Sequence, residues 1–165
     1  MAIPLSKIKP IYPPNTPDQS SESPTIQSTI TTLKLQPHIE GGYFVETDLD
    51  TLRVPNPHPP TSESDTTRSA STSIFYLLTP RSPLGAFHRN ASRTVHTLHR
   101  GRGVYVILHA DEESVRSNGG NVSVEAFVVG QDIEKGERLQ WVVEGGKYKG
   151  TFLLPDDGGG VQMGC

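Results

Sequence analysis

The histidines of segment 85–101, GAFHRNASRTVHTLHRG, are the side chains best suited to chemistry in this chain of 165 residues. Imidazole titrates near neutral pH, so a histidine can take a proton from a carbon next to a carbonyl group. That reaction also needs an acid for the forming enolate, and the candidates are Tyr43, Tyr76, Tyr105 and Tyr148. Converging imidazoles and a carboxylate would bind a metal ion instead. The segment therefore predicts either proton transfer or metal binding.

The elements that must position these side chains read as short strands from Ser73 onward. Turns separate them every 8–12 residues, which is typical of an all-β sandwich or barrel, and the glycine-rich turns fit a double-sheet jelly roll. Residues 73–154 show no 3.6-residue periodicity over three turns. The predicted strands are SIFYLLT, LGAFHR, TVHTLH, VYVILHA, VSVEAFVVG, LQWVVEGG and KYKGTFLL.

Strand periodicity limits which of these side chains can meet. Alternate residues of a strand share a face, so Thr94, His96 and Leu98 point to the same side. If that side is the barrel interior, His88 and His96 could approach each other across neighbouring strands. Together with Glu46 they would form a three-ligand metal set. The alternative is that His96 packs or hydrogen-bonds in the barrel without a metal.

The first 72 residues differ from the rest in composition. Eleven of the 14 prolines lie within the first 60 residues, and repeated prolines oppose regular helix. We expect residues 1–30 to form a disordered or loosely attached arm, or a strand that swaps onto a partner subunit. The ordered domain then covers residues 31–165. Within it, the Ser/Thr/Pro-rich residues 48–72 are predicted to be a long loop inserted between strands.

Charge and hydropathy exclude several classes of partner. The formal net charge is -3, so the chain has no basic excess for nucleic acid. No apolar run approaches the roughly 20 residues that span a bilayer, and the N-terminus has no apolar stretch typical of a secretory signal. The single cysteine, Cys165, permits no intrachain disulfide. We therefore expect a cytoplasmic protein that binds neither nucleic acid nor membrane.

The order of motifs resembles the cupin-5 family, a group of unsettled activity in the cupin superfamily. PHIEGGYFVET at 37–47 is similar to the family's opening signature, and STSIFYLLTP (71–80), FHR (87–89) and LQWVVEGGKYKG (139–150) follow in its order. The final VQMGC resembles the family's late strand, after which the family continues for a short stretch that this chain lacks. The resemblance implies a double-stranded β-helix, or cupin jelly roll, with a pocket inside the barrel, and a homodimer.

The resemblance also bears on metal binding. Cupins that bind metal use a His-x-His pair, a nearby Glu and one later His. In this sequence His88 occupies the first of these places, but Asn90 and Thr94 occupy the next two, and residues 144–149 contain no histidine. We therefore predict no cofactor, and the set His88, His96 and Glu46 remains the alternative for a metal-dependent oxygenase.

Deoxysugar epimerases of the same superfamily work without metal and suggest roles for the remaining residues. By this resemblance His88 is the base, Tyr148 the acid, and Glu46 the carboxylate that orients His88. Lys147 and Lys149, which flank Tyr148, are expected on a solvated strand edge. The ligand-binding candidates are His96, Thr94, Asn90, Arg68 and Phe87.

Two functions remain open at this stage, beside the oxygenase. One is a metal-independent isomerase, epimerase or cyclase in which His88 acts on a small oxygenated molecule. The other is a cupin that binds a small molecule without turning it over. Both predict the same ligand pocket.

Overall fold

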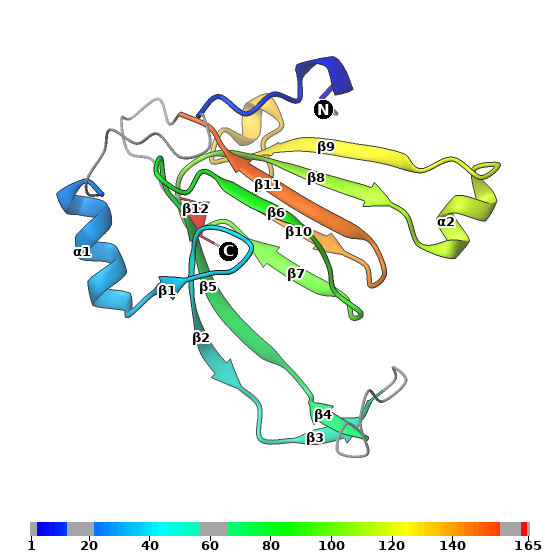
Figure 1. The fold of residues 1–165 in the computed structure, drawn as a ribbon, viewed down its shortest axis with the longest axis horizontal. Helices are drawn as coiled ribbons and strands as arrows, with labels where there is room; N and C mark the ends of the chain where they lie inside the picture. Colours follow the sequence, from blue (N-terminus) through cyan, green and yellow to red (C-terminus); the bar gives the residue numbers. More distant parts are fainter. Residues whose placement is uncertain (1–2, 13–21, 57–65, 156–162, 165) are drawn as a thin grey trace.

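The computed structural model describes residues 3–12, 22–56, 66–155 and 163–164. Antiparallel strands form two layers with the hydrophobic core between them (Figure 1). The first layer is a sheet of four strands in the order β6 (Leu84–Arg89), β11 (Tyr148–Leu153), β8 (Gly103–His109) and β9 (Ser123–Val129). The facing strands are β1 (Gln36–Pro37), β2 (Tyr43–Leu49), β5 (Thr72–Leu78) and β12 (Met163–Gly164), in that order, with the pair β7 (Thr94–Thr97) and β10 (Gln140–Val143).

The inner core takes its side chains from both layers. Strand alternation sends every second residue of β8, β9 and β11 inward, and the facing strands supply the rest. This arrangement confirms the all-β jelly roll expected from the strand series. The members of the inner core are Leu78, Leu98, Tyr105, Ile107, Phe127, Val129, Trp141, Val143 and Leu153.

A second apolar cluster lies on the outer face of the first sheet. It is built from the alternate residues Val104, Val106, Ala126 and Phe152, together with Leu154. Part of segment 3–12, which contains a short 3-10 helix η1 (Leu5–Lys7), lies against it. Ile3 and Ile8 pack against this cluster, and the amide of Ile3 donates to the carbonyl of Ala126 at 2.9 Å. This part of the predicted arm is therefore seated on its own chain.

The prediction of a disordered or loosely attached arm is wrong for residues 24–30, which belong to helix α1 (Pro24–Leu33). Ser23 caps its N-terminus by accepting from the amide of Ile26, and Pro24 occupies the first turn. Proline is compatible with a helix there, because the amide it lacks would have no intrahelical partner. The buried side chain of Ile26 anchors the helix.

The predicted loop over residues 48–72 also contains more structure than expected. Strand β2 extends to Leu49, β5 begins at Thr72, and between them β3 (Arg53–Pro55) pairs with β4 (Thr67–Ser69). The structure thus describes a paired ribbon at one end of the molecule (Figure 1).

Two short helices interrupt the later strands, where none was expected. They are α2 (Glu112–Ser117) and the 3-10 helix η2 (Ile133–Lys135), and each is too brief to show a 3.6-residue period in the sequence. None of the helices in the described parts of the chain is both long and apolar enough to cross a membrane.

Candidate functional site

A group of polar side chains lies between the two layers, beside the inner core. We call His88, His96, Lys149, Tyr105 and Glu40 the barrel site. His88 and Lys149 are direct partners across β6 and β11, so their side chains share a face. The Nζ of Lys149 lies 3.2 Å from the Nε2 of His96 on the opposing strand β7. The site therefore spans both layers.

Lys149 corrects an expectation. We predicted a solvated strand edge for it, but its exposure is only 2%. Pairing of β11 with β8 sets Lys149 opposite Ile107, a member of the inner core, and Tyr148 opposite Leu108 on the outer face. Because successive side chains of a strand point to opposite faces of the sheet, Lys149 lies inside while its neighbour Tyr148 lies outside.

His96 is held by an aromatic stack and two polar contacts. Its ring lies parallel to that of Trp141, with 5.3 Å between centroids and 9° between planes, and its Nε2 is 3.1 Å from the hydroxyl of Tyr105. Burial, with a smaller contribution from the positive charge of Lys149, lowers the pKa of His96 to about 3. His96 is therefore neutral at pH 7. Since a lysine ammonium can only donate, Nε2 accepts and the ring proton resides on Nδ1.

His88 and Glu40 form a pair that orients the imidazole. The Nδ1 of His88 lies 3.1 Å from a carboxylate oxygen of Glu40 and 3.0 Å from the carbonyl oxygen of Ala86. Both neighbours are acceptors, so Nδ1 carries the proton and Nε2 keeps the basic lone pair. The side chains of His88 and Glu40 are about one-third exposed, at 31% and 34%, so a small molecule can reach them from solvent.

The loop after β1 explains why Glu40 reaches His88. Gly41 and Gly42 have φ values of +98° and +72°, and a Cβ on Gly41 would overlap the carbonyl oxygen of Leu84. Only glycine permits this close approach of the loop to β6. The carbonyl of Glu40 also accepts from the amide of Ala86 at 2.7 Å. The Glu-Gly-Gly sequence therefore positions the carboxylate.

The structure brings three of the candidate residues near this site. His88 and His96 belong to it, and Thr94 lies half-buried on the same face of β7 as His96 and Leu98, as strand alternation predicts. Thr94 donates from its hydroxyl to the carbonyl of Ser92 at 3.5 Å. The guanidinium of Arg68 donates to the hydroxyl of Ser92, which brings the β3–β4 ribbon to the loop before β7.

The other candidates lie elsewhere. Glu46 is exposed on β2, opposite Ile74, and it is Glu40 that pairs with His88. Tyr148 lies on the outer face, with the guanidinium of Arg89 5.6 Å from its ring centroid. Phe87 is exposed and covers Gly150 on that same outer face, and Asn90 is exposed at the end of β6, where its carbonyl accepts from Gly146.

Sequence reasoning missed Glu40 and Lys149 as members of this site, and it preferred Tyr148 over Tyr105 among the four candidate acids. The signal for Glu40 was its position directly before two glycines, which permit a sharp approach to a neighbouring strand. The signal for Lys149 was the alternation of KYKGTFLL, in which Lys149, Thr151 and Leu153 share a face.

The described parts of the chain contain no group of three or more His, Cys, Asp or Glu side chains placed to hold a metal ion. In the proposed metal set, His96 directs its Nε2 lone pair at Lys149, and Glu46 lies apart from His88. A pocket of about 260 Å³ lies beside β5 and α1, with helix residues in its wall, and thus differs from the barrel pocket that we expected.

Tyr76 holds the loop that carries Glu40, and its removal gives a first prediction. Its hydroxyl donates to the carbonyl of Gly41 at 2.8 Å. We expect Tyr76→Phe to lower the unfolding free energy by about 1–2 kcal/mol, since it leaves this carbonyl without a donor. Chemical denaturation measures the loss, and Tyr12→Phe serves as a control. Equal stability of Tyr76→Phe and the wild type would contradict this role.

Two facing antiparallel layers around an inward cluster of polar side chains define a cupin-type jelly roll. The chain belongs to the cupin-5 family (DUF985) of the cupin superfamily, and the model of this family matches residues 27–165. This match confirms the resemblance to the cupin-5 family.

Similar proteins carry no established activity in their names. The chain is 43% identical over 137 residues to the uncharacterized protein YML079W of Saccharomyces cerevisiae, covering 81% of this chain and 63% of the yeast protein. A hypothetical protein from Leishmania major has a similar structure, with a TM-score of 0.64 and 30% identity over 88% of this chain and 80% of that one. Protein SO0799 from Shewanella oneidensis has a TM-score of 0.60 and 24% identity, over 84% and 74%, and supports the fold alone.

Proposed function

We propose that this protein binds a small carbonyl compound at the barrel site and transfers a proton on it without a metal ion, as an isomerase or epimerase does. The observation that carries this proposal is the Glu40–His88 pair, which fixes the protonated nitrogen of His88 and leaves Nε2 as a base. A general base must be reachable by its substrate, and the partial exposure of His88 meets that condition.

Lys149 supplies the second element of the proposed chemistry. When the Nε2 of His88 removes a proton from the carbon next to a carbonyl, the electron pair moves onto the carbonyl oxygen. A buried ammonium group beside His88 would stabilise the negative charge on that oxygen, because a charge acts strongly where water is excluded. Return of a proton to carbon then completes the isomerisation.

Tyr105 replaces Tyr148 as the proposed acid. Its hydroxyl contacts His96 inside the barrel, whereas Tyr148 stands on the outer face. Proton delivery from Tyr105 to the face of the carbon opposite His88 would invert the configuration of that carbon. If His88 instead returns the proton to the former carbonyl carbon, and the proton of the neighbouring hydroxyl moves to the enolate oxygen, the carbonyl shifts to the neighbouring carbon.

A second candidate function is ligand binding without turnover. The indole N–H of Trp141 has no hydrogen-bond partner, although the side chain is buried and stacked on His96. Buried donors usually find an acceptor, so a bound molecule could supply one. This feature fits a binding protein as well as an enzyme.

Hydrogen–deuterium exchange on a small ketone tests the proposal. We expect the protein to accelerate exchange of the C–H protons of dihydroxyacetone in D2O, followed by proton NMR. Since a positioned general base contributes about 10²–10⁴-fold, His88→Gln should remove most of the acceleration. Glu40→Gln should reduce it, whereas Glu46→Gln, an exposed carboxylate of the same type, should have no effect.

The outcomes separate the two functions. Exchange that survives His88→Gln would disprove a base role for this histidine. Binding of the ketone without any accelerated exchange would instead favour the non-catalytic cupin.

A further inference from the structure

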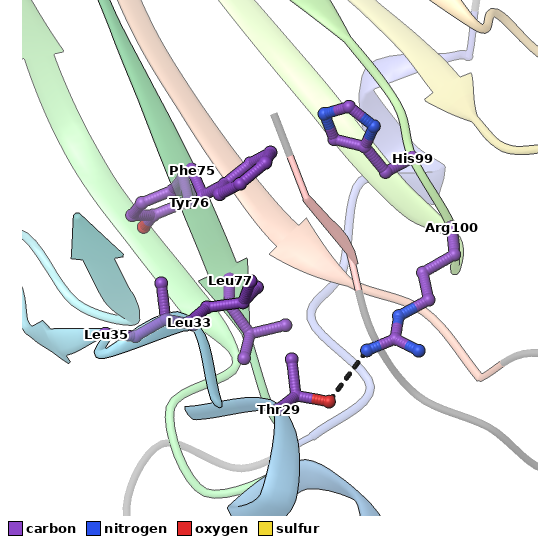
Figure 2. Close-up of a pocket in the computed structure, with 8 residues that line it drawn as sticks. All are labelled: Thr29, Leu33, Leu35, Phe75, Tyr76, Leu77, His99 and Arg100. Atoms are coloured by element: carbon purple, nitrogen blue, oxygen red, sulfur yellow. Dashed lines mark hydrogen bonds between the residues drawn. The ribbon is translucent and has the colours of Figure 1, made fainter. Parts of the chain in front are cut away.

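A pocket separate from the barrel site lies between α1 and β5 (Figure 2). Its volume is about 260 Å³, slightly below the roughly 300–1,000 Å³ typical of drug-sized ligand sites. Its apolar wall is formed by Leu33 of the helix, Leu35 after it, and Phe75 and Leu77 of the strand. The pocket therefore suits a compact apolar group.

The rim of this pocket is basic. Arg100 and His99 follow β7 and line it, and no acidic residue is among the lining side chains. One nitrogen of the Arg100 guanidinium donates to the hydroxyl of Thr29 at 2.8 Å, which holds the group against the helix (Figure 2). A guanidinium has five N–H donors, so several remain for a ligand. No carboxylate in the described chain forms an ion pair with Arg100.

His99, which precedes Arg100 in the chain, also lines the rim. Its ring packs edge-on against Phe75, with 5.3 Å between centroids and 79° between planes. This contact fixes the imidazole next to the apolar wall, and the side chain is otherwise exposed. His99 thus adds a second nitrogen-bearing side chain to the rim, next to the apolar wall.

We propose that this pocket binds a small carboxylic acid with an apolar body. The carboxylate would accept paired hydrogen bonds from Arg100, the geometry that guanidinium groups favour, and the apolar part would cover Leu33, Phe75 and Leu77. An uncharged molecule of the same shape cannot form charged hydrogen bonds with the Arg100 guanidinium, so the pocket should prefer acids to their neutral analogues. The proposal does not depend on chemistry at the barrel site, because none of the barrel-site side chains lines this pocket.

Phenylacetate is a suitable probe, and phenylacetamide is its uncharged counterpart. Titration of the isotope-labelled full-length protein, followed by NMR, should give saturable shifts at millimolar phenylacetate in the amides of Leu33, Phe75 and Arg100. Phenylacetamide should bind at least about tenfold more weakly than phenylacetate, because it lacks the carboxylate that accepts charged hydrogen bonds from Arg100. Equal binding of the two compounds would overturn the proposal, as would an absence of saturable shifts.

Variants locate the site without relying on the probe alone. Arg100→Gln should weaken phenylacetate binding by at least about tenfold, and Arg53→Gln, on the distant β3–β4 ribbon, should leave it unchanged. Leu33→Trp should abolish binding by filling the pocket, and this side chain is 39% exposed, so the fold tolerates the change. Binding retained in Leu33→Trp, or shifts centred on Trp141 instead, would place the ligand elsewhere and refute the assignment.

Discussion

Acidification from pH 7 to pH 4.5 is expected to lower the unfolding free energy by about 2.5 kcal/mol through His96 alone. The cause is the difference between its pKa of about 3 in the folded protein and the ordinary value of 6.5 in the unfolded chain. Between these two values the unfolded chain binds a proton that the folded protein does not. Stability therefore falls as the pH drops below 6.5, and the decline from this group ends near pH 3.

His96→Gln isolates this contribution. Glutamine can still accept a hydrogen bond from Lys149, but it does not titrate. Urea unfolding at pH 7 and pH 4.5 should show that the stability difference between the wild type and this variant shrinks by about 2.5 kcal/mol on acidification. The two proteins share all other titrating groups, so the contributions of these groups to the pH dependence of stability cancel in the difference.

Val95→Thr is the matched control, because it changes the neighbouring outward residue of the same strand without altering any ionisable group. Its pH profile should run parallel to that of the wild type. A parallel profile for His96→Gln as well would show that His96 titrates alike in the folded and unfolded states, and the neutral state assigned to it would be wrong.

Replacing Gly41 by alanine is expected to cost about 3 kcal/mol or more of unfolding free energy. The residue has φ +98°, which disfavours any side chain by roughly 1–2 kcal/mol. The added Cβ would also overlap the carbonyl oxygen of Leu84, and an overlap of this kind in a packed region costs about 1–3 kcal/mol more. Backbone atoms of a sheet strand cannot move aside as a flexible side chain would.

Gly120→Ala separates the two causes. Gly120 has a similar φ of +87°, but a Cβ there would meet no atom within 4 Å. This variant should lose only the backbone term of roughly 1–2 kcal/mol. Denaturation of both variants gives the comparison, and equal losses would mean that the loop carrying Glu40 does not need the close approach to β6. In Gly41→Ala the contact between Glu40 and His88 should also be lost, which the imidazole NMR signals of His88 would report.

The overall architecture could be predicted from the sequence because its signals are local. Most of the strands after Ser73 are rich in apolar and β-branched residues, with Gly or Pro in many of the turns between them, and the alternation of Thr94, His96 and Leu98 gives the inward face of β7 correctly. Helix α1 lies in a segment whose repeated prolines argue against helix, but Pro24 occupies the first turn, where proline is compatible with one.

The composition of the barrel site could be predicted only in part. The family motif points to His88, and the alternation of Thr94 and His96 in one strand points to His96. The carboxylate was placed at Glu46 instead of Glu40, because the approach of the loop to β6 depends on φ values that the sequence does not display. Lys149 was placed in solvent because lysine is almost never fully buried unless it is paired.

The pairing of β11 with its two neighbours limits how the gene can change. Inner Lys149 alternates with outer Tyr148, and inner His88 with outer Arg89. Loss or gain of one codon in the turn 144–147 would slide β11 by one position and exchange these residues between the interior and the surface. Homologues should therefore vary freely in the composition of this turn while keeping its length fixed, because an in-frame insertion or deletion of one residue there would be eliminated by selection.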